Sequence, residues 1–318
     1  MKKKPDFFVI GVVKGGSTSL YHYLDQHPEV YLPPIKETNH FAKADIHPED
    51  FLPEYALDVK LDLDAYIKKG MPEKIHIAHV NSDEHYFALY DKVEGEKTLG
   101  DVSNSYMVCP SSAQAIHDFN PDSKLIVILR NPIGRAWSQY LMNLREAKTQ
   151  EKDFISELER DAEKSPSGWG VNHQYLELGN YGRQLERYLQ LFPREQLKVI
   201  FYEEYRDRPL DILKDICHFL EVDETFQFDV SSKKNTASLP RSASLNALLV
   251  KTGVIKTLKG MVPKQLRGSL AKVLYSDKDL PSIAAEEKAY LVRYYASEVR
   301  LLSSLIEVDA SNYWPQFK

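Results

Sequence analysis

Residues 7–20 read FFVIGVVKGGSTSL, an apolar run followed by a glycine-rich loop and the start of a periodic segment. The run Phe7–Val12 predicts a short buried strand. Four residues after the loop recur at helical spacing: Leu20, Tyr23, Leu24 and His27. This spacing predicts a helix that begins near Ser17 and ends before Pro28. A strand, a glycine loop and a helix in this order form the opening half of a βαβ unit.

The loop from Gly11 to Ser19 has the composition of a phosphate cradle. Glycines after a strand let backbone N–H groups turn toward an anion, and the helix N-terminus adds partial positive charge. Lys14 supplies a full charge. The loop is not a Walker A motif, because Ser17 stands where that motif needs its lysine, which disfavours a P-loop kinase or NTPase. An ordinary tight turn remains the alternative for the loop taken alone.

A second cluster follows the apolar run Lys124–Leu129, which predicts a strand in the middle of a parallel sheet. Arg130 comes at the carboxyl end of this strand, where open α/β sheets place ligand groups. Ser138 follows eight residues later, in the first turns of a predicted helix. An arginine fork and a serine hydroxyl together suit a phosphate. Each residue alone also fits a structural role, as an ion-paired arginine or a surface serine.

The remaining chain continues the alternation of strands and helices. Helices are predicted around 137–144 and 185–192, from Pro209 and over Tyr290–Ile306, and a strand over Leu197–Tyr202. We therefore predict one α/β domain over residues 1–318, with a P-loop-like, mainly parallel central sheet between layers of helices. Residues from about 44 to 98 are less regular, and we interpret them as an insertion over one end of the sheet.

Charge is distributed unevenly along the chain. The formal net charge is −5, but residues 230–276 contain nine Lys or Arg and no Asp or Glu. The rest of the chain therefore carries 32 basic against 46 acidic side chains, a net charge of −14. This basic segment suggests an anionic partner, and a solvated basic face is the alternative.

Composition excludes several protein classes. No apolar run approaches the roughly 20 residues of a membrane span, and the N-terminal residues lack the pattern of a signal peptide. Cys109 and Cys217 form neither a metal-binding spacing nor a disulfide framework. We expect a cytoplasmic protein that binds no metal and no nucleic acid.

Taken together, the motifs resemble those of sulfotransferases that use 3′-phosphoadenosine 5′-phosphosulfate (PAPS). Residues 14–20, KGGSTSL, are similar to their 5′-phosphosulfate loop, and residues 129–138, LRNPIGRAWS, look like their 3′-phosphate motif. Further similar segments follow the family's order: PPIKETNHF at 33–41, GDVS at 100–103 and GNY at 179–181. The likeness runs from Phe7 to Trp314 and is closer to the heparan-sulfate-type and bacterial branch than to the cytosolic phenol and steroid branch.

The resemblance implies two sites for the donor's anionic groups. The 5′-phosphosulfate would be held by six residues: Lys14, Gly15, Gly16, Ser17, Thr18 and Ser19. Arg130 and Ser138 would hold the 3′-phosphate. A later loop that closes over the 3′-phosphate corresponds to Lys233, Lys234 and Asn235 with Arg241, at the start of the basic segment.

The resemblance also implies an in-line transfer of a sulfuryl group to a hydroxyl or amine. Lys14 would stabilise the charge that develops on the leaving oxygen. Glu37 matches the general base of the heparan-sulfate-type branch, and His40 is the alternative base, with an unperturbed pKa better suited to neutral pH. Asp101 and Ser103 would line the acceptor side.

The acceptor itself is not specified by the sequence. A saccharide, a lipid and a small hydroxylated molecule all remain open, and segment 230–276 could contact an anionic membrane. A non-catalytic nucleotide- or anionic-glycan-binding module on the same scaffold is the alternative to an enzyme.

Overall fold

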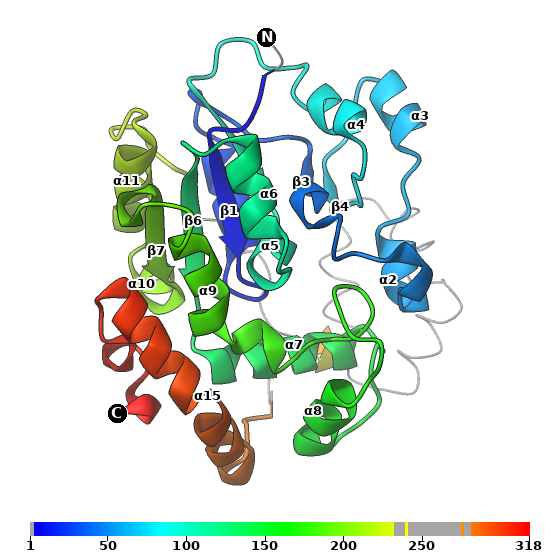
Figure 1. The fold of residues 1–318 in the computed structure, drawn as a ribbon, viewed down its shortest axis with the longest axis vertical. Coiled ribbons are helices and arrows are strands. Elements are labelled where there is room, and N and C mark those ends of the chain that lie inside the picture. Colours follow the sequence, from blue (N-terminus) through cyan, green and yellow to red (C-terminus); the bar gives the residue numbers. More distant parts are fainter. Residues whose placement is uncertain (1–2, 232–238, 241–274, 277–280) are drawn as a thin grey trace.

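The computed structural model describes residues 3–231, 239–240, 275–276 and 281–318. A parallel sheet forms its centre and has helices on both faces, which confirms the predicted P-loop-like α/β class (Figure 1). Its strands in spatial order are β2 (Val30–Tyr31), β5 (Thr98–Val102), β1 (Phe7–Gly11), β6 (Lys124–Leu129) and β7 (Leu197–Phe201). Two small sheets accompany it: β3 (Ile35–Glu37) with β4 (Ile75–Ile77), and β8 (Leu239–Pro240) with β9 (Tyr275–Ser276).

Helices connect the strands and cover both faces of the sheet. In chain order they are α1 (Ser17–Leu24), α2 (Pro53–Asp58), α3 (Leu63–Lys68), α4 (Asp83–Ala88), α5 (Ser105–Val108), α6 (Ser112–Phe119), α7 (Pro132–Arg145), α8 (Phe154–Ala162), α9 (Tyr181–Leu189), α10 (Tyr202–Asp207), α11 (Pro209–Leu220) and α15 (Ala285–Ile306). Short 3-10 turns lie between them, at His40–Ala42, Pro48–Asp50, Glu177–Gly179, Arg194–Gln196, Ala310–Asn312 and Pro315–Phe317.

Alternate residues of β1 supply two separate cores. Phe8 and Ile10 belong to the core beneath α5, α6, α9 and α15, whereas Phe7 and Val9 belong to the core beneath α1 and α11. Successive side chains of a strand point to opposite faces, so a strand buried on both sides appears as an unbroken apolar run. Figure 1 shows α5, α6 and α9 in front of the sheet.

Most predicted elements occur at or near the expected residues. Strand β6 has the predicted bounds, and α1 begins at Ser17. The terminal helix α15 begins at Ala285, five residues before the predicted start. Strand β5 was not predicted, because its sequence TLGDV carries a glycine and a buried aspartate that interrupt the apolar pattern.

Residues 44–98 contain local secondary structure despite their irregular pattern. Helices α2, α3 and α4 lie here, and β4 pairs in parallel with β3, with Ile35 opposite Ile75 and Glu37 opposite Ile77. Through this pairing, segment 44–98 lies beside β3, whose last residue is Glu37.

Gly100 provides a direct test of how tightly the central strands pack. A Cβ at Gly100 would lie 2.2 Å from Cζ of Phe7, whose ring is fully buried on the neighbouring strand. We expect Gly100→Ala to lower the free energy of unfolding by about 1–3 kcal/mol in urea denaturation, because the core must shift to admit the methyl group. Gly95→Ala is the matched control, since its Cβ meets nothing within 4 Å. Equal stability of the two variants would contradict this packing.

Candidate active site

The glycine loop between β1 and α1 leaves the start of the helix open to a ligand. Gly16 adopts the left-handed conformation with φ of 102°, and no side chain caps the first turn of α1. The first N–H groups of a helix have no intrahelical partners and carry partial positive charge. Gly15 admits no side chain, because a Cβ there would lie 2.6 Å from the Ile128 carbonyl oxygen. The loop therefore presses against β6 and presents donors to an anion.

Lys14 lies in this loop with a left-handed backbone, φ 64°. Its Nζ is 3.4 Å from Sδ of Met142 on α7. Burial, with a smaller contribution from Arg145, lowers the pKa of Lys14 to about 8. The Lys14 amine is therefore largely protonated at neutral pH, but neighbouring acidic groups compensate its positive charge only weakly. Such a charge suits a group that binds an anionic ligand.

Arg130 joins the two predicted phosphate motifs. It follows β6, and its Nη1 donates to the Lys14 carbonyl oxygen at 3.0 Å. Its guanidinium lies over the ring of Tyr202, 4.8 Å from the centroid. A guanidinium has five N–H donors, so most of them remain for a ligand. Asn131 caps α7 with its own side chain, and Ser138 of this helix lines the cavity.

Glu37 lies at the end of β3 and is almost completely buried. One carboxylate oxygen, Oε1, accepts both from Lys36 Nζ at 2.6 Å and from Asn104 Nδ2 at 2.8 Å. The other oxygen, Oε2, accepts no hydrogen bond from the residues that the structure describes. Two donors on one oxygen orient the carboxylate and leave Oε2 for a ligand in the cavity.

One cavity of about 730 Å³ brings these residues together. Its walls include most of the predicted site: Lys14, Gly16, Ser17, Thr18, Ser19, Glu37, Arg130 and Ser138. A volume of this size falls within the range of small-molecule sites. Residues separated by more than a hundred positions in sequence thus share one ligand space.

His40 does not reach this cavity. Its ring stacks on Tyr86 with centroids 4.1 Å apart, and its Nδ1 lies 2.7 Å from the Val80 carbonyl oxygen. Burial lowers the pKa of His40 to about 4. The ring is packed in the core, which corrects the expectation that His40 is an alternative base.

Asp101 and Ser103 also lie away from the cavity, contrary to the prediction that they line the acceptor side. Oδ2 of the fully buried Asp101 accepts from Thr38, Tyr86 and Tyr106 at 2.8–2.9 Å. Its Oδ1 accepts from Ser103, whose Oγ in turn accepts from the backbone N–H of Thr38. These hydrogen bonds connect β5 to the turn after β3. Because this turn begins directly after Glu37, they help to fix the position of the Glu37 backbone.

The predicted loop residues Lys233, Lys234, Asn235 and Arg241 lie outside the described residues, as does most of segment 230–276. Their assignment to the 3′-phosphate stays a prediction.

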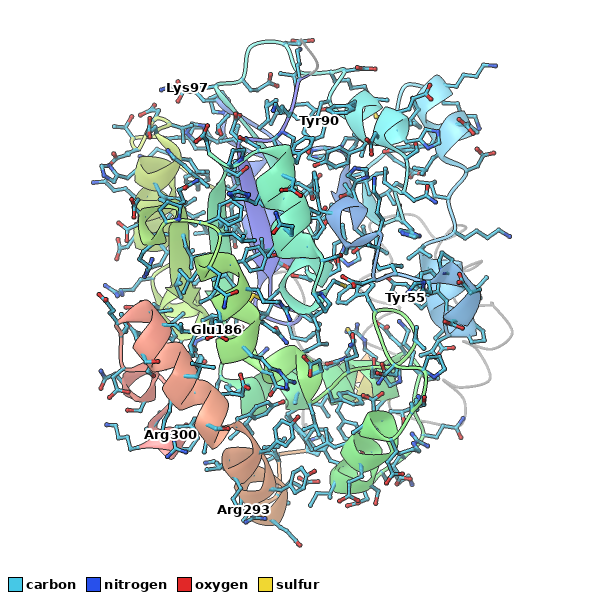
Figure 2. The ribbon with its side chains drawn as sticks, in the orientation of Figure 1. Tyr55, Tyr90, Lys97, Glu186, Arg293 and Arg300 are labelled. Carbon is cyan, nitrogen blue, oxygen red and sulfur yellow. The ribbon has the colours of Figure 1, made fainter. Side chains whose placement is uncertain are left out.

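The far side of the cavity includes residues that the motifs did not indicate. They come from α2, β4, the end of α7 and the loop 168–174, with Tyr55, His76, Glu146 and Trp169 among them. Figure 2 shows Tyr55 at α2, next to this loop. The irregular segment 44–98 was the available signal for α2 and β4, whereas no pattern pointed to loop 168–174.

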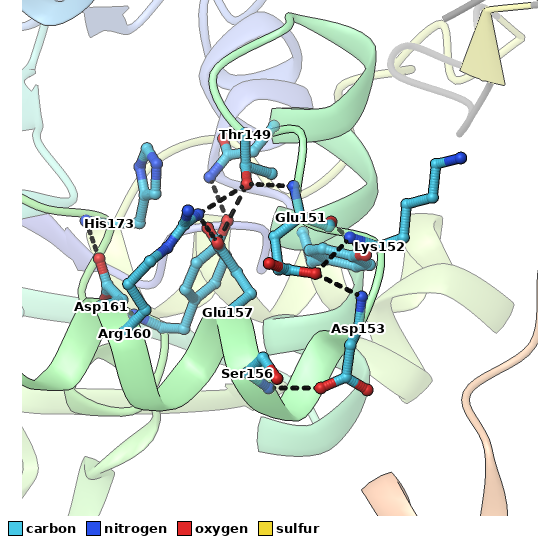
Figure 3. A network of polar contacts seen from close by, with 12 residues as sticks. Thr149, Glu151, Lys152, Asp153, Ser156, Glu157, Arg160, Asp161 and His173 are labelled. Carbon is cyan, nitrogen blue, oxygen red and sulfur yellow. Dashed lines mark hydrogen bonds and ion pairs between the residues drawn. The ribbon is translucent and has the colours of Figure 1, made fainter.

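A buried polar network holds loop 168–174 in place (Figure 3). Asp161 on α8 accepts from the backbone N–H groups of His173 at 2.7 Å and Tyr175 at 3.1 Å. On the same helix Glu157 accepts from Thr149 and Arg160. The loop is therefore anchored to α8 by the Asp161 carboxylate, in addition to contacts within the loop such as that from the Gly168 N–H to Asn172.

The described residues contain neither a candidate metal site nor a candidate membrane-spanning helix. Among them, no group of three His, Cys, Asp or Glu side chains is arranged to hold a metal ion. None of the helices in this part of the chain is long and apolar enough to cross a membrane.

The fold and the cavity together define a P-loop-like α/β protein in which a glycine loop and a second basic motif share one ligand site. Residues 5–226 match the model of the sulfotransferase family, and the chain belongs to that family.

Relatives and solved structures agree with this assignment. The chain is 27% identical over 224 residues to the heparan sulfate glucosamine 3-O-sulfotransferase 5 of Mus musculus, covering 70% of this chain and 55% of that protein. It is 24% identical over 239 residues to the bifunctional heparan sulfate N-deacetylase/N-sulfotransferase 1 of Caenorhabditis briggsae, covering 72% and 24%. It thus spans about half the length, or less, of these two relatives. A sulfotransferase structure from Alicyclobacillus acidocaldarius matches with a TM-score of 0.69 and 27% identity, covering 98% of this chain and 99% of that one.

The position of Asp101 yields a prediction that separates a structural role from contact with the acceptor. We expect Asp101→Asn to lower the free energy of unfolding by about 1–3 kcal/mol, because an amide N–H₂ would face hydroxyl donors in a buried site. Affinity for adenosine 3′,5′-bisphosphate, measured by calorimetry on the folded variant, should stay unchanged. Asn104→Asp, which alters a residue that does line the cavity, is the comparison. A stable Asp101→Asn variant would contradict the structural role.

Proposed function

We propose that this protein transfers a sulfuryl group from PAPS to a hydroxyl or amine of an acceptor. The observation that carries the proposal is the convergence of Lys14, Arg130 and Glu37 on one cavity that also includes the start of α1. Membership of the sulfotransferase family supports the same reaction. The related proteins whose names mention heparan sulfate suggest a saccharide as one acceptor class.

The described residues fit a donor with two separated anionic groups. The open first turn of α1 with Ser17, Thr18 and Ser19 would bind the 5′-phosphosulfate. Arg130 and Ser138, which line the same cavity, would bind the 3′-phosphate. When bound, PAPS supplies an activated sulfuryl group, and Lys14 and Arg130 supply the positive charge that this chemistry needs without a metal ion.

Lys14 and Glu37 have separate roles in this proposal. The Lys14 ammonium stabilises negative charge on the oxygen that leaves the sulfur, and such preorganised charges commonly contribute the largest catalytic effect. Glu37 takes the proton from the acceptor through Oε2 while Lys36 and Asn104 hold Oε1.

The alternative hypothesis is that the protein is a non-catalytic binding module. It predicts that adenosine 3′,5′-bisphosphate binds while ³⁵S from labelled PAPS reaches no acceptor. The oriented Glu37 carboxylate favours the enzyme, since binding of the donor does not require a base in the cavity.

We also propose a cytoplasmic location, which the two buried, unpaired thiols of Cys109 and Cys217 support. Fractionation of expressing cells tests this proposal, and recovery of the protein from the membrane pellet would count against it.

Lys14 gives a pH-dependent test. Its pKa of about 8 means that the charge is present below that pH and is lost above it. We expect kcat/KM with PAPS to fall as pH rises through about 8, and Lys14→Met to lower kcat about 10²–10³-fold. Lys14→Arg should keep part of the activity without the alkaline decline, because arginine stays protonated. An unchanged rate in Lys14→Met would remove Lys14 from the mechanism.

Glu37 and His40 are distinguished by a pair of substitutions. Glu37→Gln keeps the shape and the contact with Asn104 but cannot accept a proton, so kcat should fall about 10²–10⁴-fold while affinity for adenosine 3′,5′-bisphosphate is retained. His40→Gln should lower stability through the lost stacking on Tyr86 yet leave kcat of the folded enzyme near normal. The reverse pattern would reassign the base to His40.

A further inference from the structure

The wall of the cavity beyond Glu37 differs in charge from the donor end. Glu54 and Asp58 project from α2, and Glu146 follows the end of α7, all lining the cavity. Glu146 and Asp58 both lie 3.1 Å from Nζ of Lys148, which places Glu146 beside α2. This wall therefore contains three carboxylates in addition to the proposed base.

The described cations on this wall are already paired. Nζ of Lys148 lies 3.1 Å from both Asp58 and Glu146, and Nη2 of Arg145 lies 3.1 Å from Glu146. The carboxylates of Glu146 and Asp58 raise the pKa of Lys148 despite its burial. Glu54 has no ion-pair partner among the residues that the structure describes. The described wall thus offers an uncompensated negative charge and no uncompensated positive one.

Two aromatic side chains, Tyr55 and Trp169, also line this part of the cavity. Nε1 of Trp169 donates to the Tyr55 hydroxyl, and the two rings meet edge to face, with centroids 6.5 Å apart at 90°. Gly170 lets the loop approach, because a Cβ there would lie 2.5 Å from the Tyr55 ring. The backbone N–H of Leu52 also donates to the Gly170 carbonyl oxygen at 2.9 Å. These contacts hold the two rings in place in the cavity wall, where they offer apolar contact area to a ring-bearing ligand.

We propose that the acceptor is a ring-bearing alcohol or amine that is uncharged or cationic, and not a carboxylated or sulfated glycan. This inference rests on the proposed function and specifies the acceptor class of the same site. The ring packs against Tyr55 and Trp169, and an ammonium on the acceptor pairs with Glu54. An acidic acceptor would place its charge beside carboxylates without a described cation to receive it.

Two matched sets of acceptors test the proposal with ³⁵S-labelled PAPS. The phenols are tyramine, 4-ethylphenol and 4-hydroxyphenylpropionate, and the tetrasaccharides are chitosan, chitin and hyaluronan. We expect the cationic and neutral members to exceed the anionic member in kcat/KM at least tenfold in each set that is sulfated. Equal or greater rates with the anionic members would overturn the proposal, as would transfer to none of the six.

Charge reversal at Glu54 ties the preference to this wall. We expect Glu54→Lys to lower kcat/KM for the cationic acceptor at least tenfold and to raise it for the anionic one. Glu49→Lys is the matched control, because Glu49 is exposed and does not line the cavity. A Glu54→Lys variant with unchanged preference would show that another region selects the acceptor.

Binding of adenosine 3′,5′-bisphosphate distinguishes the two levels of failure. If the nucleotide binds and the anionic acceptors are preferred, the acceptor assignment fails while the proposed function stands. If the nucleotide does not bind to the wild-type protein, the proposed function itself fails.

Discussion

The hydrogen bond from Arg130 to the Lys14 carbonyl oxygen is the contact on which the site depends. It joins the loop after β1 to the end of β6, the strand that lies beside β1 in the sheet. Gly15 makes this contact possible, because any side chain there would meet the Ile128 carbonyl oxygen. Two basic groups that repel each other are thereby held at one edge of the sheet, where their charges add for an anionic ligand. Burial and, to a smaller extent, Arg145 lower the pKa of Lys14, and Arg130 adds a lesser repulsion in the same direction.

A second constraint sets the other side of the cavity. The buried carboxylate of Asp101 on β5 accepts hydrogen bonds from hydroxyl groups of the residue after β5, the turn after β3, α4 and α5. Buried polar groups of this kind are tolerated only when their hydrogen bonds are satisfied, and a satisfied network holds its members rigidly. Glu37 lies immediately before this turn. The general base proposed here is therefore placed by a network that touches no ligand, whereas Lys36 and Asn104 orient its carboxylate directly.

The predictive power of the sequence differed between the two halves of the site. The glycine loop and Arg130 follow strands, and Ser138 lies in the helix after Arg130, so these positions indicated that the residues would lie at one edge of a parallel sheet. The predictions for Asp101 and His40 failed for a common reason. In the sequence, a polar residue among apolar neighbours has the same pattern whether its side chain lines a cavity or forms hydrogen bonds within the core. Loop 168–174 carries no motif, and its place beside α2 depends on the anchoring carboxylate of Asp161 and on the approach of Gly170 to Tyr55.

The class of fold and the donor end of the site could be predicted from the sequence, because both depend on short-range order: an apolar strand, a glycine turn and a helix start within about ten residues. The acceptor end could not, because it forms only when distant segments fold together. Its residues come from four separate segments. The net charge that they present depends on which side chains form ion pairs, as Lys148 does with Asp58 and Glu146. The basic segment 230–276 suggested an anionic partner, yet the described cavity wall beyond Glu37 is acidic. The electric field that a ligand meets depends on which charges lie close together in space, and not on which are close together in the sequence.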